Sequence, residues 1–131
     1  MARSASPHPT ELELLILKVL WEQSPLPVRE IRAALANLGR ELAHTSVITT
    51  LNIMQKKGYL TRRQDGNAFL FAPQVSREET SQNMLADVVN RVFDGSPSAT
   101  VVSLFDSSDV NEDELKELRR LINRKLREKA E

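Results

Sequence analysis

Cysteine is missing from this chain of 131 residues, and long apolar runs are missing as well. Without cysteine the protein can form no disulfide, no thiolate metal site and no thiol nucleophile, which fits a reducing compartment. The longest apolar run, residues 14–21, contains a lysine and is too short to cross a bilayer. Residues 1–9 have no apolar region of the kind found in secretory signals, so we expect a disordered tail there. These features predict a cytoplasmic protein.

Residues that carry catalytic or cofactor chemistry are equally scarce. The four glycines are dispersed and form no glycine-rich phosphate loop. The two histidines, His8 and His44, lie far apart in the sequence and have no cysteine or acidic cluster beside them. The serines lack a nucleophile motif. The sequence therefore predicts no metal, no cofactor and no enzymatic activity.

Formal net charge is zero, but the charges are unevenly distributed along the chain. Lysine and arginine outnumber the acidic residues in residues 1–75, and the reverse holds in residues 76–131. A polyanion would therefore prefer the first part. Ordinary scatter of charges explains so small a difference equally well.

Helical periodicity and turn signals divide the first part of the chain into elements. Residues 10–13, TELE, fit a capping box, and a predicted helix follows to about Gln23. SPLP at 24–27 separates it from a second helix, in which Pro27 fits the first turn. Residues 59–64 and 68–73 predict two short strands around a turn.

The pattern after this hairpin is helical again. Ser76 begins a second capping box, residues 99–105 predict a shorter helix, and Asn111 begins a leucine-rich last helix. With a third helix over residues 44–57, the first part of the chain has three helices followed by a hairpin, which are the parts of a winged helix-turn-helix. The sequence thus predicts a mainly α fold with a small β-hairpin wing. We expect a winged-helix DNA-binding domain over residues 10–75 and a helical dimerisation domain over residues 76–131.

Residues 44–57 combine hydroxyl, amide and β-branched side chains. On a helix, one stripe is apolar and consists of Val47, Leu51 and Met54, whereas the opposite stripe is short and polar. Short polar side chains let a helix approach the major groove and bond base edges. The predicted base contacts are Thr45, Ser46, Thr49, Asn52 and Ile53. The predicted phosphate contacts are Lys56, Lys57, Arg62 and Arg63. The alternative is a threonine-rich exposed helix without a partner.

The C-terminal helices carry more apolar surface than three short helices can cover by themselves. A two-fold partner would bury it. The predicted dimer interface consists of Val88, Val92, Leu115, Leu118 and Ile122. Packing within one chain is the alternative, and both arrangements can contribute.

Four phrases resemble the penicillinase repressor family of winged-helix regulators. They are TELELLILKVLWEQSPLPVREIRAAL (10–35), HTSVITTLNIMQKKGYLTRR (44–63), GNAFLFAPQVSREE (66–79) and FDGSPSATVVSLF (93–105). The resemblance implies a homodimeric transcriptional repressor on a near-palindromic double-stranded operator. It also implies release by proteolysis or another signal, with a membrane sensor-protease as a further partner. The proteolytic segment would fall near Leu104 and Phe105, which are alternatively residues of the dimer core.

Two positions depart from the family pattern. The family's usual arginine falls on Ile53, and the arginine that often follows the wing glycine falls on Asn67. These departures imply a diverged operator. They also leave open a winged-helix protein–protein interaction module without specific DNA binding, against which the basic cluster at Lys56–Arg63 speaks. A regulator that senses a small molecule would need an enclosed pocket.

Overall fold

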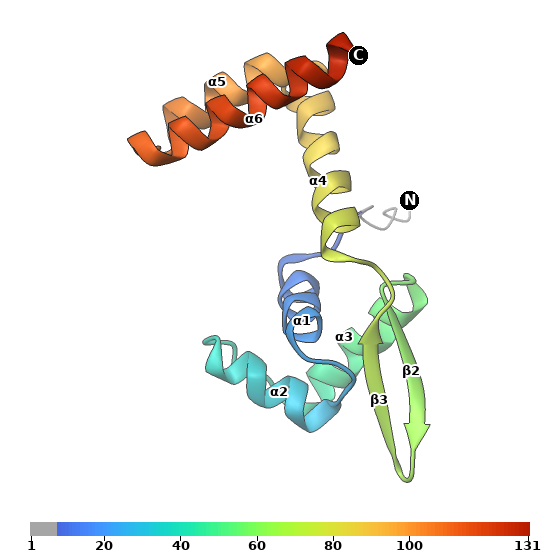
Figure 1. Ribbon diagram of the computed structural model, residues 1–131. Helices are drawn as coiled ribbons and strands as arrows, with labels where there is room; N and C mark the ends of the chain where they lie inside the picture. The colour runs from blue at the N-terminus through green and yellow to red at the C-terminus, as the bar shows by residue number, and fades with distance from the viewer. Residues whose placement is uncertain (1–7) are drawn as a thin grey trace, which may run out of the picture. The chain divides into compact units, whose positions relative to one another are not determined.

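The computed structural model describes residues 8–131, so most of the tail expected over residues 1–9 lies outside the described residues. The elements follow in the order α1 (Glu11–Glu22), β1 (Leu26–Pro27), α2 (Val28–Asn37), α3 (His44–Lys56), β2 (Leu60–Asp65), β3 (Ala68–Pro73), α4 (Arg77–Val92), α5 (Pro97–Ser107) and α6 (Glu112–Ala130) (Figure 1). The chain divides into two compact units, and the boundary falls inside α4, after Leu85.

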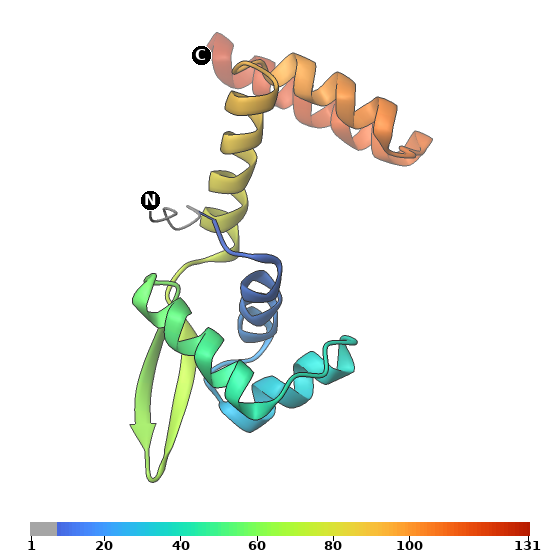
Figure 2. The same cartoon turned by 180° about the vertical axis from the view of Figure 1, so that it is seen from behind.

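The first unit contains α1 to α3 and a three-stranded antiparallel sheet in the order β1-β3-β2. Contacts join α3 to α2 and to β2, as the view from behind shows (Figure 2). Strand β1, which pairs Leu26 with Phe71, was not expected from the sequence. Two residues that include a proline carry no strand periodicity, so only the partner strand reveals this pairing. The predicted mainly α fold with a winged helix is confirmed.

The core of the first unit joins its three helices to the base of the sheet. Its buried side chains include Ile16, Leu20, Ile31, Leu35, Val47, Leu51, Met54, Leu60 and Phe71. Each helix contributes one apolar stripe to this core, and burial of a stripe fixes the rotation of its helix. The rotation of α3 in turn decides which of its side chains reach solvent.

A buried ion pair fastens the end of α3 to the start of α1. The Glu13 carboxylate accepts a hydrogen bond from the Thr10 backbone N–H at 2.8 Å, which completes the predicted capping box. The same carboxylate lies 3.0 Å from Lys57 Nζ, and Glu13 is only 3% exposed. Burial raises the pKa of the neighbouring Tyr59 hydroxyl, and the Lys57 ammonium offsets part of that rise. A buried ion pair adds little net stability, because the cost of desolvation offsets the attraction, but loss of one partner leaves the other charge uncompensated.

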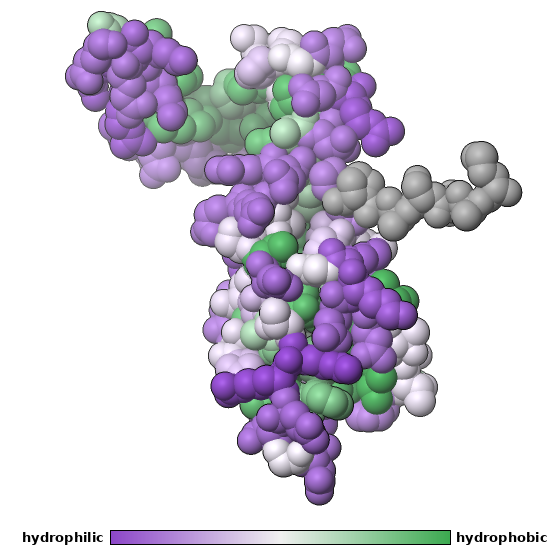
Figure 3. Space-filling view, turned by 90° about the vertical axis from the view of Figure 1, so that its right-hand side faces the viewer, coloured by the Kyte–Doolittle hydropathy of each residue, from purple (hydrophilic) through white to green (hydrophobic). Residues whose placement is uncertain are grey.

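The second unit consists of the end of α4 with α5 and α6. Ser96 and Asn111 cap α5 and α6 by accepting hydrogen bonds from the backbone N–H groups of Ala99 and Glu114. Neither α5 nor α6, each described along its whole length, contains a buried residue. Figure 3 shows hydrophobic residues of this unit gathered in a hollow that hydrophilic residues border. Within residues 8–131, no helix is long and apolar enough to span a membrane, and no cluster of acidic residues and histidines is suited to a metal.

Candidate nucleic-acid interface

Helix α3 presents a polar face to solvent. Its buried residues are Val47, Leu51 and Met54, as the helical pattern predicts. The five predicted base contacts are all exposed, namely Thr45, Ser46, Thr49, Asn52 and Ile53. Ile53 is 44% exposed and lies at the edge of this face. The burial therefore fits the predicted division of the helix, whereas the roles of these residues in DNA binding stay predictions.

The N-terminus of α3 is open. Helix α3 lies wholly within the described residues 8–131. Its N-cap residue, Ala43, makes no side-chain cap, and its first turn holds no acidic residue. Helices α1 and α6 differ, because Thr10 and Asn111 cap them and acidic residues occupy their first turns. The first backbone N–H groups of α3, with the positive end of the helix dipole, are thus available to an anion such as phosphate.

The threonine hydroxyls of α3 are already oriented. Thr49 Oγ1 donates to the Thr45 carbonyl oxygen at 2.9 Å, and Thr50 Oγ1 donates to the Ser46 carbonyl oxygen at 3.0 Å. Since the proton of Thr49 is used within the helix, this residue offers acceptor lone pairs and a methyl group. Those groups match an amino group of adenine or cytosine, or a thymine methyl.

The wing is a tight two-residue hairpin. Asp65 pairs with Ala68 across the turn, and Gly66 at the first central position has a φ of 63°, which suits a primed turn. The Arg62 guanidinium lies over the Phe69 ring, 4.4 Å from its centroid. Arg62 and Arg63 are both exposed and, as successive residues of a strand, point to opposite faces of the hairpin.

A groove of about 500 Å³ separates α3 from the wing and from the start of α2. His44 and Asn52 line it from α3, Arg62 and Asn67 line it from the wing, and Arg29 lines it from α2. Arg29 is not among the contacts predicted from the sequence, because only the tertiary fold brings the first turn of α2 beside the polar face of α3. Arginine side chains from α2 and from the wing thus lie beside the polar face of α3.

Lys57 does not fit its predicted role as a phosphate contact. Its Nζ hydrogen-bonds both carboxylate oxygens of Glu13, at 3.0 and 3.1 Å, and its side chain is mostly buried. The cause is its position at the C-cap of α3, where the side chain turns toward α1. Lys56, one residue earlier, is exposed, and its role as a phosphate contact stays a prediction.

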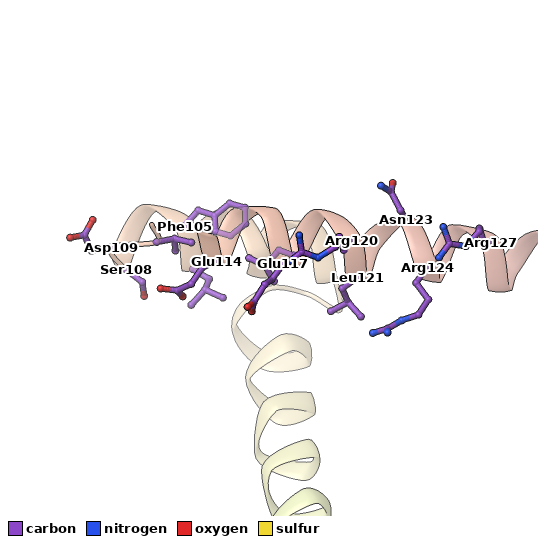
Figure 4. Close-up of a pocket in the computed structure, with 13 residues that line it drawn as sticks. Phe105, Ser108, Asp109, Glu114, Glu117, Arg120, Leu121, Asn123, Arg124 and Arg127 are labelled. Atoms are coloured by element: carbon purple, nitrogen blue, oxygen red, sulfur yellow. The ribbon is translucent and has the colours of Figure 1, made fainter. Parts of the chain in front are cut away.

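A second groove, of about 1080 Å³, runs between α5 and α6. Acidic residues lie toward one end of it and arginines toward the other (Figure 4). Leu104 and Phe105, the predicted proteolytic segment, line this groove from α5 and are exposed. Of the predicted dimer contacts, Leu118 is half-buried and the other four are exposed, namely Val88, Val92, Leu115 and Ile122.

Comparisons with known proteins agree with the family resemblance. The sequence pattern of the penicillinase repressor family matches residues 9–124. The transcriptional regulator BlaI of Mycobacterium tuberculosis is 32% identical over 114 residues, which are 86% of this chain and 80% of that protein. The penicillinase repressor of Bacillus licheniformis is 22% identical over 125 residues, which are 95% of this chain and 97% of that protein.

The fold has a counterpart among solved structures. The solution structure of the DNA binding domain of the repressor BlaI superposes with a TM-score of 0.50 and 23% identity, over 59% of this chain and 93% of that one. This likeness supports the winged-helix fold of the first unit. The family pattern covers most of the chain, from α1 into α6. The chain belongs to the penicillinase repressor family.

Proposed function

We propose that this chain is a transcriptional repressor that binds double-stranded operator DNA as a homodimer, with α3 in the major groove. The observation that carries the proposal is the solvent face of α3, where short polar side chains stand beside an uncapped, positive helix end. The major groove admits an α-helix whose side chains are short enough to reach base edges. Membership of a family whose relatives are named as repressors supports the same role. The proposal involves no enzymatic step.

The interface divides into base contacts and phosphate contacts. Thr45, Ser46, Thr49 and Asn52 would bond base edges, and Ile53 would contact a thymine methyl. Phosphates would be bound by the first N–H groups of α3 and by Lys56, Arg62, Arg63 and Arg29. Phosphate contacts give affinity without sequence information, so the operator sequence depends on the α3 face.

The dimer rests on the apolar surface of the second unit. Val92 is 66% exposed and Ile122 is 56% exposed, although both are large aliphatic residues on helices. A helical hairpin without a buried residue lacks a core of its own, and a second copy would supply one. Helix α6 begins with acidic residues and ends with basic ones, so two α6 helices packed antiparallel about a two-fold axis would place opposite charges together.

Release by proteolysis is a further part of the proposal. Leu104 and Phe105 lie within α5, so cleavage between them requires this helix to unwind locally. Cleavage there would separate α6 from the rest of the chain and remove one wall of the groove between α5 and α6. The dimer would then lose apolar contacts, and the affinity for a two-half-site operator would fall. A membrane sensor-protease is the proposed agent.

Selection of binding sequences from random duplex DNA tests the proposal without knowledge of the operator. The full chain is expected to enrich a palindromic motif and to bind it with a Kd of about 10⁻⁸ M or tighter at physiological salt. Failure to retard any duplex at micromolar protein and low salt would rule out the repressor function. Ile53 and Asn67, which stand where the family pattern has arginines, would then favour the protein–protein interaction module.

A further inference from the structure

The start of α4 is held to the end of α1 by contacts that the proposed DNA interface does not use. The indole Nε1–H of Trp21 donates to the carbonyl oxygen of Val75 at 2.9 Å. The guanidinium of Arg77 lies over the Trp21 ring, 5.2 Å from its centroid, and 3.8 Å from the Glu22 carboxylate. We call the contacts among Trp21, Val75 and Arg77 the α4 clasp. All three residues belong to the first compact unit.

Further contacts fix Val75 and the residues on either side of the clasp. The backbone N–H of Gln74 donates to the Tyr59 carbonyl oxygen at 2.8 Å, and Val75 packs against the core. On the other side of Arg77, Thr80 is buried in the second turn of α4. The connection from β3 to α4 is therefore fixed before, at and after the clasp. A free linker would instead be exposed and rich in small or polar residues.

Helix α4 connects the two units as one continuous element. It begins in the first unit at Arg77 and ends in the second unit at Val92. A helical connection is a semi-rigid spacer, stiffer than an irregular linker of the same length. The clasp acts on the first turn of α4. That turn lies in the first unit, ahead of the boundary after Leu85.

We infer that Trp21 and Arg77 are positioning residues that fix the first turn of α4 and thereby restrict the half-site spacing that the dimer accepts. The inference rests on the proposed function, because spacing has meaning only for a dimer on two half-sites. Each added base pair moves one half-site by about 3.4 Å and rotates it by about 35° relative to the other. If the connection between the two units is stiff, a changed spacer lowers the affinity of the dimer for the operator. If it is loose, the DNA-binding units can move to the new half-site positions at little cost.

A spacing series tests the inference with the full chain. The selected operator is prepared with its spacer shortened or lengthened by one or two base pairs, and a single half-site duplex is measured in parallel. W21F removes the indole donor and R77Q removes the guanidinium, whereas E22Q removes only the exposed ion pair and is the matched control. Thermal unfolding checks that each variant is folded. Arg77 is exposed, so R77Q keeps the test available if W21F does not fold.

The chain without substitutions is expected to lose about tenfold in affinity for each base pair away from its preferred spacer. In W21F and R77Q this loss is expected to shrink to about threefold, while half-site affinity stays within about twofold of the unsubstituted chain. E22Q should keep the sharp profile. An unchanged spacing profile in both W21F and R77Q would overturn the inference.

A second measurement needs no DNA. Because the natural chain has no cysteine, N37C and N83C can carry a pair of spin labels within the first unit, on α2 and α4. In the labelled chain without further substitutions, we expect a narrow distribution of distances between the two labels. W21F or R77Q should broaden it at least about twofold, and E22Q should leave its width unchanged. Equal widths would overturn the clasp as a positioning device. If the unsubstituted chain bound no duplex, the proposed function and the spacing role would both fail. A broader label distance distribution in W21F and R77Q would still show that the clasp fixes the first turn of α4.

Discussion

At the scale of single residues, Lys56 and Lys57 are neighbours in the sequence but lie in different environments. Lys56 is exposed at the end of α3, whereas Lys57 pairs with the buried Glu13. K57M is expected to destabilise the fold by about 3–5 kcal/mol, because it leaves a buried carboxylate without its cation. K56M, the matched control, should change the free energy of unfolding by less than about 0.5 kcal/mol. Urea unfolding measures both, and equal effects would contradict the structure.

Thr49 and Thr50 provide a second matched pair. Both hydroxyls donate to the carbonyl oxygen four residues earlier, but Thr49 is exposed and Thr50 is half-buried. T49V keeps a similar shape and removes the hydroxyl acceptor, so it is expected to cost about 1–3 kcal/mol of binding to the selected operator. Binding to random DNA should stay unchanged. T50V should bind the operator normally, and an equal loss in both variants would argue against base contact by Thr49.

At the scale of elements, periodicity predicted much of what the structure shows. The stripe of Val47, Leu51 and Met54 specified the rotation of α3. This rotation could be predicted because it depends only on the helical spacing of the apolar residues that face the core. Strand β1, the groove position of Arg29 and the partner of Lys57 could not be predicted in this way. Each depends on a contact between segments far apart in the sequence. A single sequence carries no local signal for such contacts.

The wing adds a prediction about salt dependence. Arg62 lines the groove beside α3 and is held over the Phe69 ring. R62Q is expected to weaken binding to all DNA sequences and to lower the slope of log K against log salt by about 0.9. F69L keeps an apolar residue but removes the aromatic face, so it should weaken binding less and leave the slope unchanged. Titrations at four salt concentrations distinguish the two, and an unchanged slope in R62Q would exclude a phosphate contact.

At the scale of the whole molecule, the two compact units differ in how completely they bury their apolar residues. The first has a continuous core, whereas α5 and α6 have no buried residue over their described length. An isolated second unit would leave its aliphatic side chains in water, which costs free energy for each one. Association with a second copy, as proposed above, would remove that cost. The oligomeric state is therefore expected to determine both the stability of the second unit and the affinity for a palindrome.

V92D tests this dependence. Two copies would bring the introduced carboxylates into a shared apolar interface, where burial of unpaired charge is strongly unfavourable. The variant is expected to sediment as a monomer at micromolar concentration and to lose about 100-fold in affinity for the full operator, while half-site binding stays within about twofold. N90D adds the same charge two residues earlier on α4, at an exposed polar position, and should remain dimeric. A dimeric V92D, or a monomeric N90D, would show that the apolar face around Val92 is not the interface.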